Sequence, residues 1–193
     1  MSRSEIETTI QPFIEVLDEF EIPYHIGGSV ASSVFGIARS TMDIDMVVAM
    51  TGDRVVALAK RLEATYYVSE DSIIEAVARK SSFNLVHLET MLKIDVFILK
   101  TRAFDLAAFQ RRRKDHLDSE NPQMKYYITS PEDIILKKLE WYQKGDMKSE
   151  RQWNDIIGVL KVQGDSLDLV YCKKWAQQLG VAELLERAFQ EAR

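Results

Sequence analysis

The chain has 193 residues, of which 46% are hydrophobic and 28% are charged, and its formal net charge is −5 at pH 7, a composition typical of a globular protein. Cys172 is the only cysteine, which excludes a disulfide framework and a cysteine-based zinc site and fits a reducing cytosol. The acidic start is unlike a signal peptide, no apolar run reaches about 18 residues, and the negative charge argues against broad non-specific binding of nucleic acid.

The chain begins with a predicted helix, a strand and a tight turn. Apolar residues fall near a 3.6-residue period over residues 4–20, which predicts a helix in which Pro12 either kinks the first turns or marks the true start. Pro23 favours an extended segment, so we expect the next residues to form a strand. Gly27 and Gly28 follow, and they allow the backbone to turn sharply and to approach a ligand closely.

A short helix and a second strand come next. Ser29 opens a helix expected over residues 30–38, so that free amide groups and a hydroxyl point at one place, which suits a phosphate. After thirteen further residues, Asp43 and Asp45 fall in a strand predicted over residues 42–48. Because alternate residues of a strand share one face, the two carboxylates point the same way, and the apolar residues between them point into a core.

Two interpretations remain open for Arg39 and Thr41, which precede the acidic strand. In the first, they face a nucleotide or orient Asp43. In the second, they belong to a solvated helix exit, where a cation such as Arg39 is favourable.

The middle of the chain predicts further mixed α and β structure. We expect helices over residues 53–63 and 69–80, a short strand over 65–68, and a hairpin of strands over 82–89 and 92–99. Asp95 lies in the centre of the last strand, which is otherwise apolar. Because unpaired buried carboxylates are costly, we expect this strand to lie beside that of Asp43 and Asp45, with a divalent cation such as Mg²⁺ between the three acids.

A helix predicted over residues 103–114 ends in the basic run Arg111-Arg112-Arg113-Lys114. This run is either a solvated helix end, where cations are favourable, or a patch that contacts the phosphates of an RNA or a nucleotide. Residues 118–122 form a candidate boundary loop, and a short strand over 124–128 closes the mixed part of the chain.

Only helices are predicted from there to the end of the chain. Ser130 and Pro131 are a strong helix start, and helices are expected over residues 130–143, 149–162, 167–179 and 181–189. Lys138 falls within an apolar stripe and needs a partner such as a triphosphate, unless its stem only covers apolar surface. Asp155 lies four residues after Arg151 and off the apolar face, which favours an exposed ion pair.

These residues resemble the nucleotidyltransferase superfamily, which has the DNA-polymerase-beta-like fold. The resemblance rests on Gly28-Ser29, Asp43-x-Asp45 thirteen residues later, and Asp95 in a later apolar strand. The helical half is similar to the AbiEii-like nucleotidyltransferases, a group that includes toxins. It matches them in Lys138 and in Arg151-Gln152-Trp153-Asn154-Asp155, where Gln152 replaces the first acid of the family pattern.

The resemblance implies an α/β (α+β) fold. A small mixed β-sheet nucleotidyltransferase core flanked by helices would span residues 1–128, and a C-terminal helical bundle would form a subdomain over 129–193. The resemblance also implies that Asp43, Asp45 and Asp95 are catalytic and bind Mg²⁺, with two ions about 3.5–4 Å apart. It assigns nucleotide or phosphate binding to Gly27, Gly28, Ser29, Arg39, Thr41, Lys138 and Asp155.

The implied reaction moves an NMP from an NTP to an acceptor hydroxyl on an RNA end such as that of tRNA, on a protein or on a small molecule. Two other hypotheses remain: an inactive member that binds a nucleotide or a partner protein, and an antibiotic nucleotidyltransferase, which shares the core motif. A toxin-like activity would imply an antitoxin partner. We expect the chain to be cytoplasmic and a monomer or a small dimer.

Overall fold

One mixed sheet forms the centre of the protein. The computed structural model describes residues 3–41, 43–117 and 123–193, so Met42 and the predicted boundary loop 118–122 lie outside the described residues. The strands run in the order β3-β4-β5-β2-β1-β7-β6. They are β1 (Tyr24–Ile26), β2 (Asp43–Val48), β3 (Tyr66–Tyr67), β4 (Ser82–His87), β5 (Lys93–Ile98), β6 (Arg113–Asp115) and β7 (Tyr126–Ile128).

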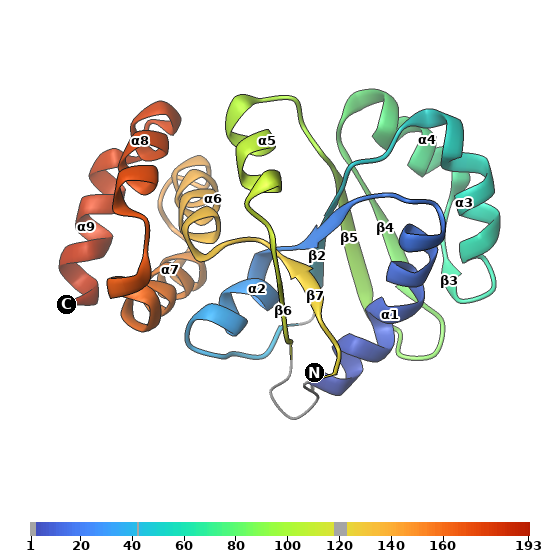
Figure 1. Cartoon of the computed structure of the whole chain (residues 1–193), viewed down its shortest axis with the longest axis horizontal. Coiled ribbons are helices and arrows are strands. Elements are labelled where there is room, and N and C mark those ends of the chain that lie inside the picture. The colour runs from blue at the N-terminus through green and yellow to red at the C-terminus, as the bar shows by residue number, and fades with distance from the viewer. Residues whose placement is uncertain (1–2, 42, 118–122) are drawn as a thin grey trace.

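Helices flank this sheet at both ends (Figure 1). They are α1 (Arg3–Glu19), α2 (Gly28–Phe35), α3 (Val55–Leu62), α4 (Glu70–Arg79), α5 (Ala103–Gln110), α6 (Pro131–Lys144), α7 (Glu150–Gln163), α8 (Leu169–Leu179) and α9 (Ala182–Ala192). Figure 1 shows α1, α3 and α4 at the end of the sheet that carries β3 and β4, and α6 to α9 at the other end. The expected α/β fold class is confirmed. No helix among the described residues is long and apolar enough to cross a membrane.

The two faces of the central strands differ in burial. Ile44 and Met46 of β2 and Val96 of β5 are fully buried on one face, and α4 packs against β4 and β5. The other face of these strands is only partly covered, and it carries Asp45 and Asp95 among other residues. The alternation of buried and accessible residues therefore leaves one side of the sheet available to a ligand.

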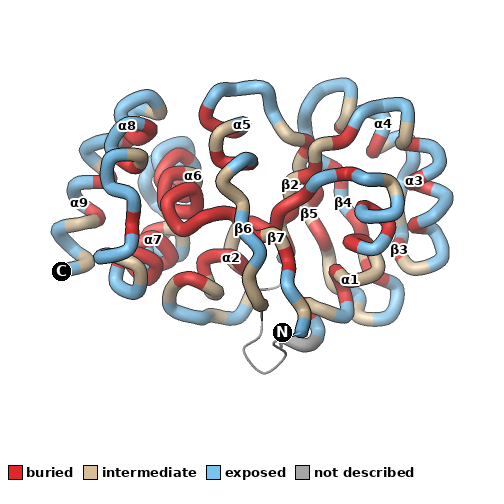
Figure 2. The backbone as a smooth tube through the Cα atoms, viewed as in Figure 1, coloured by how far each residue is buried: buried red, intermediate tan, exposed pale blue. Residues whose placement is uncertain are grey.

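The helical second half shares the core of the protein. Figure 2 shows α6 as mostly buried, and α6 and α7 pack against each other and against α2. The sheet ends at Ile128 and every later described element is helical. The division at residue 128 into a core and a helical subdomain stays a prediction.

The structure corrects the boundaries of two predicted elements and decides between the two interpretations of Pro12 in a third. The helix expected over 103–114 ends at Gln110, and Arg113–Asp115 instead form the edge strand β6, paired antiparallel with β7. Helix α1 begins at Arg3 and runs through Pro12, so Pro12 does not mark the start of the helix. Helix α2 ends at Phe35 rather than at residue 38, since the backbone of Gly36 is no longer helical, with φ of −137° and ψ of −145°. Gly36 also lies so close to α7 that a Cβ there would be 2.8 Å from the backbone nitrogen of Val159.

Candidate active site

Asp45 and Asp95 lie opposite each other on the parallel strands β2 and β5. Asp43 lies two residues before Asp45 and is opposite Lys93 in the same register. The strand that carries Asp95 therefore lies beside the strand that carries the other two acids, as the sequence predicted. Side chains in this register project from the same face of the sheet, so the three acids belong to one site.

Lys93 joins two of these acids. Its Nζ lies 2.9 Å from Asp95 Oδ2 and 3.5 Å from Asp43 Oδ1. The hydrogen bond to Asp95 raises the pKa of Lys93, so the side chain is an ammonium at neutral pH. On the other side of Asp95, the side-chain amide of Asn84, oriented with its nitrogen toward Asp95, donates to Asp95 Oδ1 at 2.5 Å. Neither Lys93 nor Asn84 was predicted, although their strand positions place both beside Asp95.

Asp45 has a different environment. Among the described residues its carboxylate has no hydrogen-bond or ion-pair partner, and its pKa is raised by burial and then by the neighbouring charge of Asp95. Its carboxylate lies directly against the glycine turn, since a Cβ on Gly28 would be 1.8 Å from Asp45 Oδ2. Gly28 also has a φ of +55°. Both the close approach and the left-handed backbone therefore require glycine at this position.

The three carboxylates have the oxygen atoms that a metal site needs, but they are not arranged as a complete metal site. No group of three or more His, Cys, Asp or Glu side chains in the described part of the chain is arranged to hold a metal ion. However, carboxylate oxygens are the ligands that Mg²⁺ prefers, and Asp45 is a partly buried acid with a raised pKa that a cation would relieve. The residues present therefore fit a divalent cation, provided that Lys93 gives up its position between Asp43 and Asp95.

A second cluster brings α2, α6 and α7 together around Asp155. Asp155 is only 7% exposed, and it accepts hydrogen bonds from Arg39 Nε at 2.7 Å and from Arg39 Nη2 at 3.0 Å. It also accepts a hydrogen bond from Lys138 Nζ at 2.8 Å, and Lys138 donates to Gln152 Oε1 at 3.1 Å. The expectation of an exposed pair between Arg151 and Asp155 is therefore wrong, because α7 turns Asp155 toward α6 and α2.

The charges in this cluster stabilise one another. Burial alone would raise the pKa of Asp155, but the hydrogen bonds from Arg39 and Lys138 outweigh it and hold this pKa below its usual value. Burial lowers the pKa of Lys138, and Asp155 offsets part of that shift. The partner that Lys138 was expected to need is thus present within the chain.

This cluster reaches both the glycine turn and the acids. Arg39 Nη2 donates to Ser29 Oγ at 2.5 Å, so the cluster contacts the first turn of α2. Lys138 is also close enough to Asp45 to lower its pKa. An ammonium has three donors and Lys138 uses two of them within the cluster, so one N–H remains for a substrate oxygen.

Thr41 and Gly27 hold the backbone of the site. Thr41 Oγ1 donates to the carbonyl of Asp43 at 3.2 Å, which supports the interpretation in which Thr41 orients Asp43. The amide of Gly27 donates to the carbonyl of Asp45 at 2.9 Å and so ties the turn to β2. Gly27 has extended backbone and is the N-cap of α2, which therefore begins one residue before Ser29.

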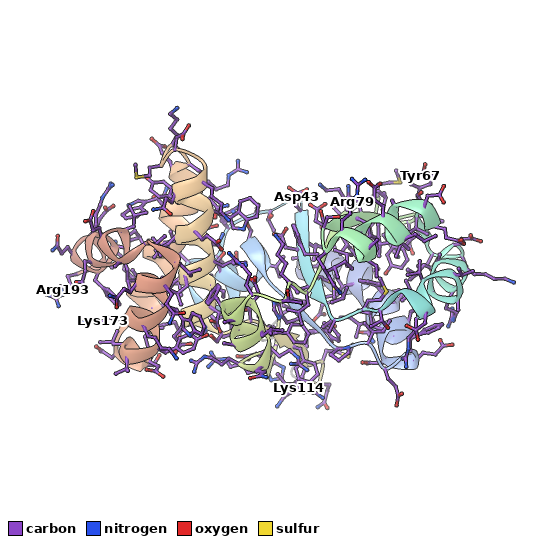
Figure 3. The ribbon with its side chains drawn as sticks, turned by 90° about the horizontal axis from the view of Figure 1, so that it is seen from above. Asp43, Tyr67, Arg79, Lys114, Lys173 and Arg193 are labelled. Atoms are coloured by element: carbon purple, nitrogen blue, oxygen red, sulfur yellow. The ribbon has the colours of Figure 1, made fainter. Side chains whose placement is uncertain are left out.

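The basic run at Arg111 to Lys114 does not join the site. The guanidinium of Arg112 lies over the rings of Phe109 and Tyr127, at 4.4 Å and 5.1 Å from their centres. In Figure 3, which views the protein from above, the labelled Lys114 and Asp43 lie on opposite sides of the molecule. Stacking on aromatic rings accounts for much of this run.

Solved structures with this architecture include several nucleotidyltransferases. The antibiotic-resistance factor ANT(2'')-Ia superposes with a TM-score of 0.56 at 16% identity, covering 98% of this chain and 97% of that one. The chain has a nucleotidyltransferase fold. A nucleotidyltransferase-like protein from Paracoccidioides brasiliensis gives 0.57 at 18% identity, covering 98% and 94%. The lincomycin-bound lincosamide adenylyltransferase LnuA gives 0.50 at 14% identity, covering 81% and 97%. No family model and no curated protein matches the sequence.

Proposed function

We propose that this nucleotidyltransferase fold carries an active, Mg²⁺-dependent site that moves an NMP from an NTP to an acceptor hydroxyl. The observation that supports it most is the register pairing of Asp45 with Asp95 directly beside the Gly28 turn. Each acid of the resemblance is present, and Gly28 and Lys138, two of the groups expected to bind phosphate, lie near Asp45. An inactive, nucleotide-binding member of the fold would not need to retain all three acids.

Asp43, Asp45 and Asp95 would hold one or two Mg²⁺ ions, whose chemistry is to stabilise charge on the phosphate oxygens of the nucleotide. The amide groups at the start of α2, together with Ser29, Arg39 and Lys138, would bind the β- and γ-phosphates. Asp155 would act as a positioning residue, because it holds Arg39 and Lys138 in place before substrate arrives.

The transfer would be a single displacement at the α-phosphorus of the NTP. The acceptor oxygen forms a bond to the α-phosphorus, the bond from the α-phosphorus to the bridging oxygen breaks, and pyrophosphate leaves. Asp95 would take the proton of the acceptor hydroxyl. Asn84 would orient the Asp95 carboxylate through the hydrogen bond at 2.5 Å.

Two acceptor classes have support. The pairing of Lys138 with Asp155 brings together two residues of the AbiEii-like resemblance, which supports a toxin-like enzyme that modifies tRNA, another RNA or a protein and has an antitoxin partner. The match to ANT(2'')-Ia extends over 98% of this chain, including its helical half, which supports the alternative of a small-molecule acceptor such as an antibiotic. One of the solved forms of that protein is bound to adenylyl-2''-tobramycin.

The experiment is incubation of the protein with Mg²⁺, each α-labelled NTP, and either tRNA, a cell lysate or an aminoglycoside. We expect label in one acceptor class, and complete loss of transfer in Asp43→Ala and Asp45→Asn. Asp165→Asn, at an exposed position far along the chain, is the charge-matched control and should keep full activity.

Stability separates a catalytic role of the acids from a structural one. Because burial and Asp95 raise the pKa of Asp45, this carboxylate costs folding free energy at neutral pH, and Asp45→Asn should keep or raise the thermal midpoint in metal-free buffer. A large loss of metal-free stability in Asp45→Asn, or nucleotide binding without transfer to any acceptor, would contradict the proposed activity.

A further inference from the structure

The side chain of Lys93 lies where the proposed function places a divalent cation. Its ammonium contacts Asp95 at 2.9 Å and Asp43 at 3.5 Å, and these are two of the three carboxylates proposed as metal ligands. Asp45 is the third, and its carboxylate has no hydrogen-bond or ion-pair partner in the described part of the chain. Lys93 is therefore the internal cation of two of the three acids, Asp43 and Asp95.

The strand register places Lys93 beside both Asp43 and Asp95. Lys93 shares a face with Asp95 because the two are two residues apart on β5, and it is paired in register with Asp43 on β2. The side chain is 40% exposed and is a flexible four-carbon stem, so its ammonium can leave toward solvent without disturbing the sheet.

A metal ion and an ammonium cannot occupy the same carboxylate oxygens. Three carboxylates and one ammonium give the group of side chains a charge of about −2, and exchange of the ammonium for a divalent ion brings that charge closer to zero. A metal ion that binds Asp43 Oδ1 and Asp95 Oδ2 therefore breaks the two contacts of Lys93, and the free energy of those contacts is lost from the affinity for the ion.

We propose that Lys93 is a tethered counter-ion: it holds Asp43 and Asp95 in place when no metal is bound, and it competes with the divalent cation for them. Lys93 is thus a positioning residue that sets how readily the site takes up metal. This inference rests on the proposed function, because it needs the acids to be metal ligands.

The test measures metal binding and not turnover. Mn²⁺ titrations of the full chain, followed by electron paramagnetic resonance of the free ion and by calorimetry, would compare wild type with Lys93→Met, without nucleotide. We expect Lys93→Met to bind Mn²⁺ roughly tenfold more tightly, since the competing charge is gone. Lys93→Arg keeps the charge and should stay within about threefold of wild type.

Lys100→Met is the matched control. This variant also removes one lysine charge, but Lys100 lies seven residues after Lys93 and beyond the end of β5. Only a long-range electrostatic effect would therefore change the affinity of this variant for Mn²⁺. Lys93→Gln provides a second neutral variant if Lys93→Met folds poorly. The rise in thermal midpoint on addition of Mg²⁺ should also be larger in Lys93→Met than in wild type.

The outcomes separate this inference from the proposed function. If wild type binds Mn²⁺, Asp45→Asn abolishes that binding, and Lys93→Met binds no more tightly than wild type or more weakly, the counter-ion role is overturned while the metal site stands. If neither wild type nor Lys93→Met binds Mn²⁺ at millimolar concentrations, the metal site of the proposed function is overturned as well.

Discussion

Asp155 on α7 and Arg39 after α2 are joined by two hydrogen bonds, of 2.7 Å and 3.0 Å, although 116 residues separate them in the sequence. The same carboxylate holds Lys138 at 2.8 Å. A residue from the helical half of the chain therefore determines where two cations lie beside the glycine turn. Through these contacts the helical half forms part of the candidate site.

Removal of the Asp155 carboxylate should destabilise the protein strongly. Asp155→Ala leaves the ammonium of Lys138, whose side chain is 6% exposed, without its charge partner, and breaking a buried pair in this way typically costs about 3–5 kcal/mol. Urea unfolding at neutral pH would measure the loss. Asp165→Ala, at an exposed position just beyond α7, should change the free energy of unfolding by less than about 0.5 kcal/mol.

A double-mutant cycle isolates the pair. Lys138→Met combined with Asp155→Leu removes both charges, so the double variant should be more stable than the sum of the two single losses implies. Additive losses would mean that Lys138 and Asp155 do not depend on each other.

Gly28 and Gly27 provide a matched pair of substitutions. Gly28→Ala would place a Cβ 1.8 Å from Asp45 Oδ2 in a backbone with φ of +55°, so it should lower the free energy of unfolding by about 1–3 kcal/mol and displace the carboxylate. A Cβ on Gly27 has nothing within 4 Å, and its φ is −127°, so Gly27→Ala should leave the thermal midpoint nearly unchanged. Equal effects of the two substitutions on thermal unfolding would contradict this account of the turn.

The acid sensitivity of folding should depend on Glu140. Burial alone would raise its pKa, but hydrogen bonds from Arg102 at 2.6 Å and 3.1 Å and from Lys144 at 2.8 Å outweigh it and lower this pKa from 4.5 to about 2. A carboxyl whose pKa is lower in the folded state stabilises the protein fully above pH 4.5, and this stabilisation is lost as the pH falls toward 2.

Glu140→Gln tests whether Glu140 causes this loss of stability in acid. Between pH 7 and pH 3, wild type should lose more folding free energy than Glu140→Gln, by about 1–3 kcal/mol, in denaturant titrations at each pH. Glu186→Gln, at an exposed position of α9, is the control and should follow wild type. Parallel pH profiles for wild type and Glu140→Gln would show that the hydrogen bonds of Glu140 with Arg102 and Lys144 do not cause the loss of stability in acid.

Part of the site could be predicted because its signal is local. The spacing from Gly28-Ser29 to Asp43 and Asp45, and an acid in the middle of an apolar strand, indicated one acidic site beside a turn, and the pairing of β2 with β5 agrees with it. Lys138 was identified as a cation in an apolar stripe, and it is buried. Lys93 was missed, although its position two residues before Asp95 already placed both on one face.

By itself, the sequence determined the α/β class, the strand that carries two acids, the glycine turn and the helical second half, because periodicity and turn chemistry act over a few residues. Only the tertiary structure decided that Asp155 is buried between Arg39 and Lys138, and that Arg113 to Asp115 extend the sheet instead of ending a helix. Those outcomes depend on which faces of distant elements pack together. The hydrogen bonds and ring contacts formed across such a junction outweigh the local preferences of the residues that make it.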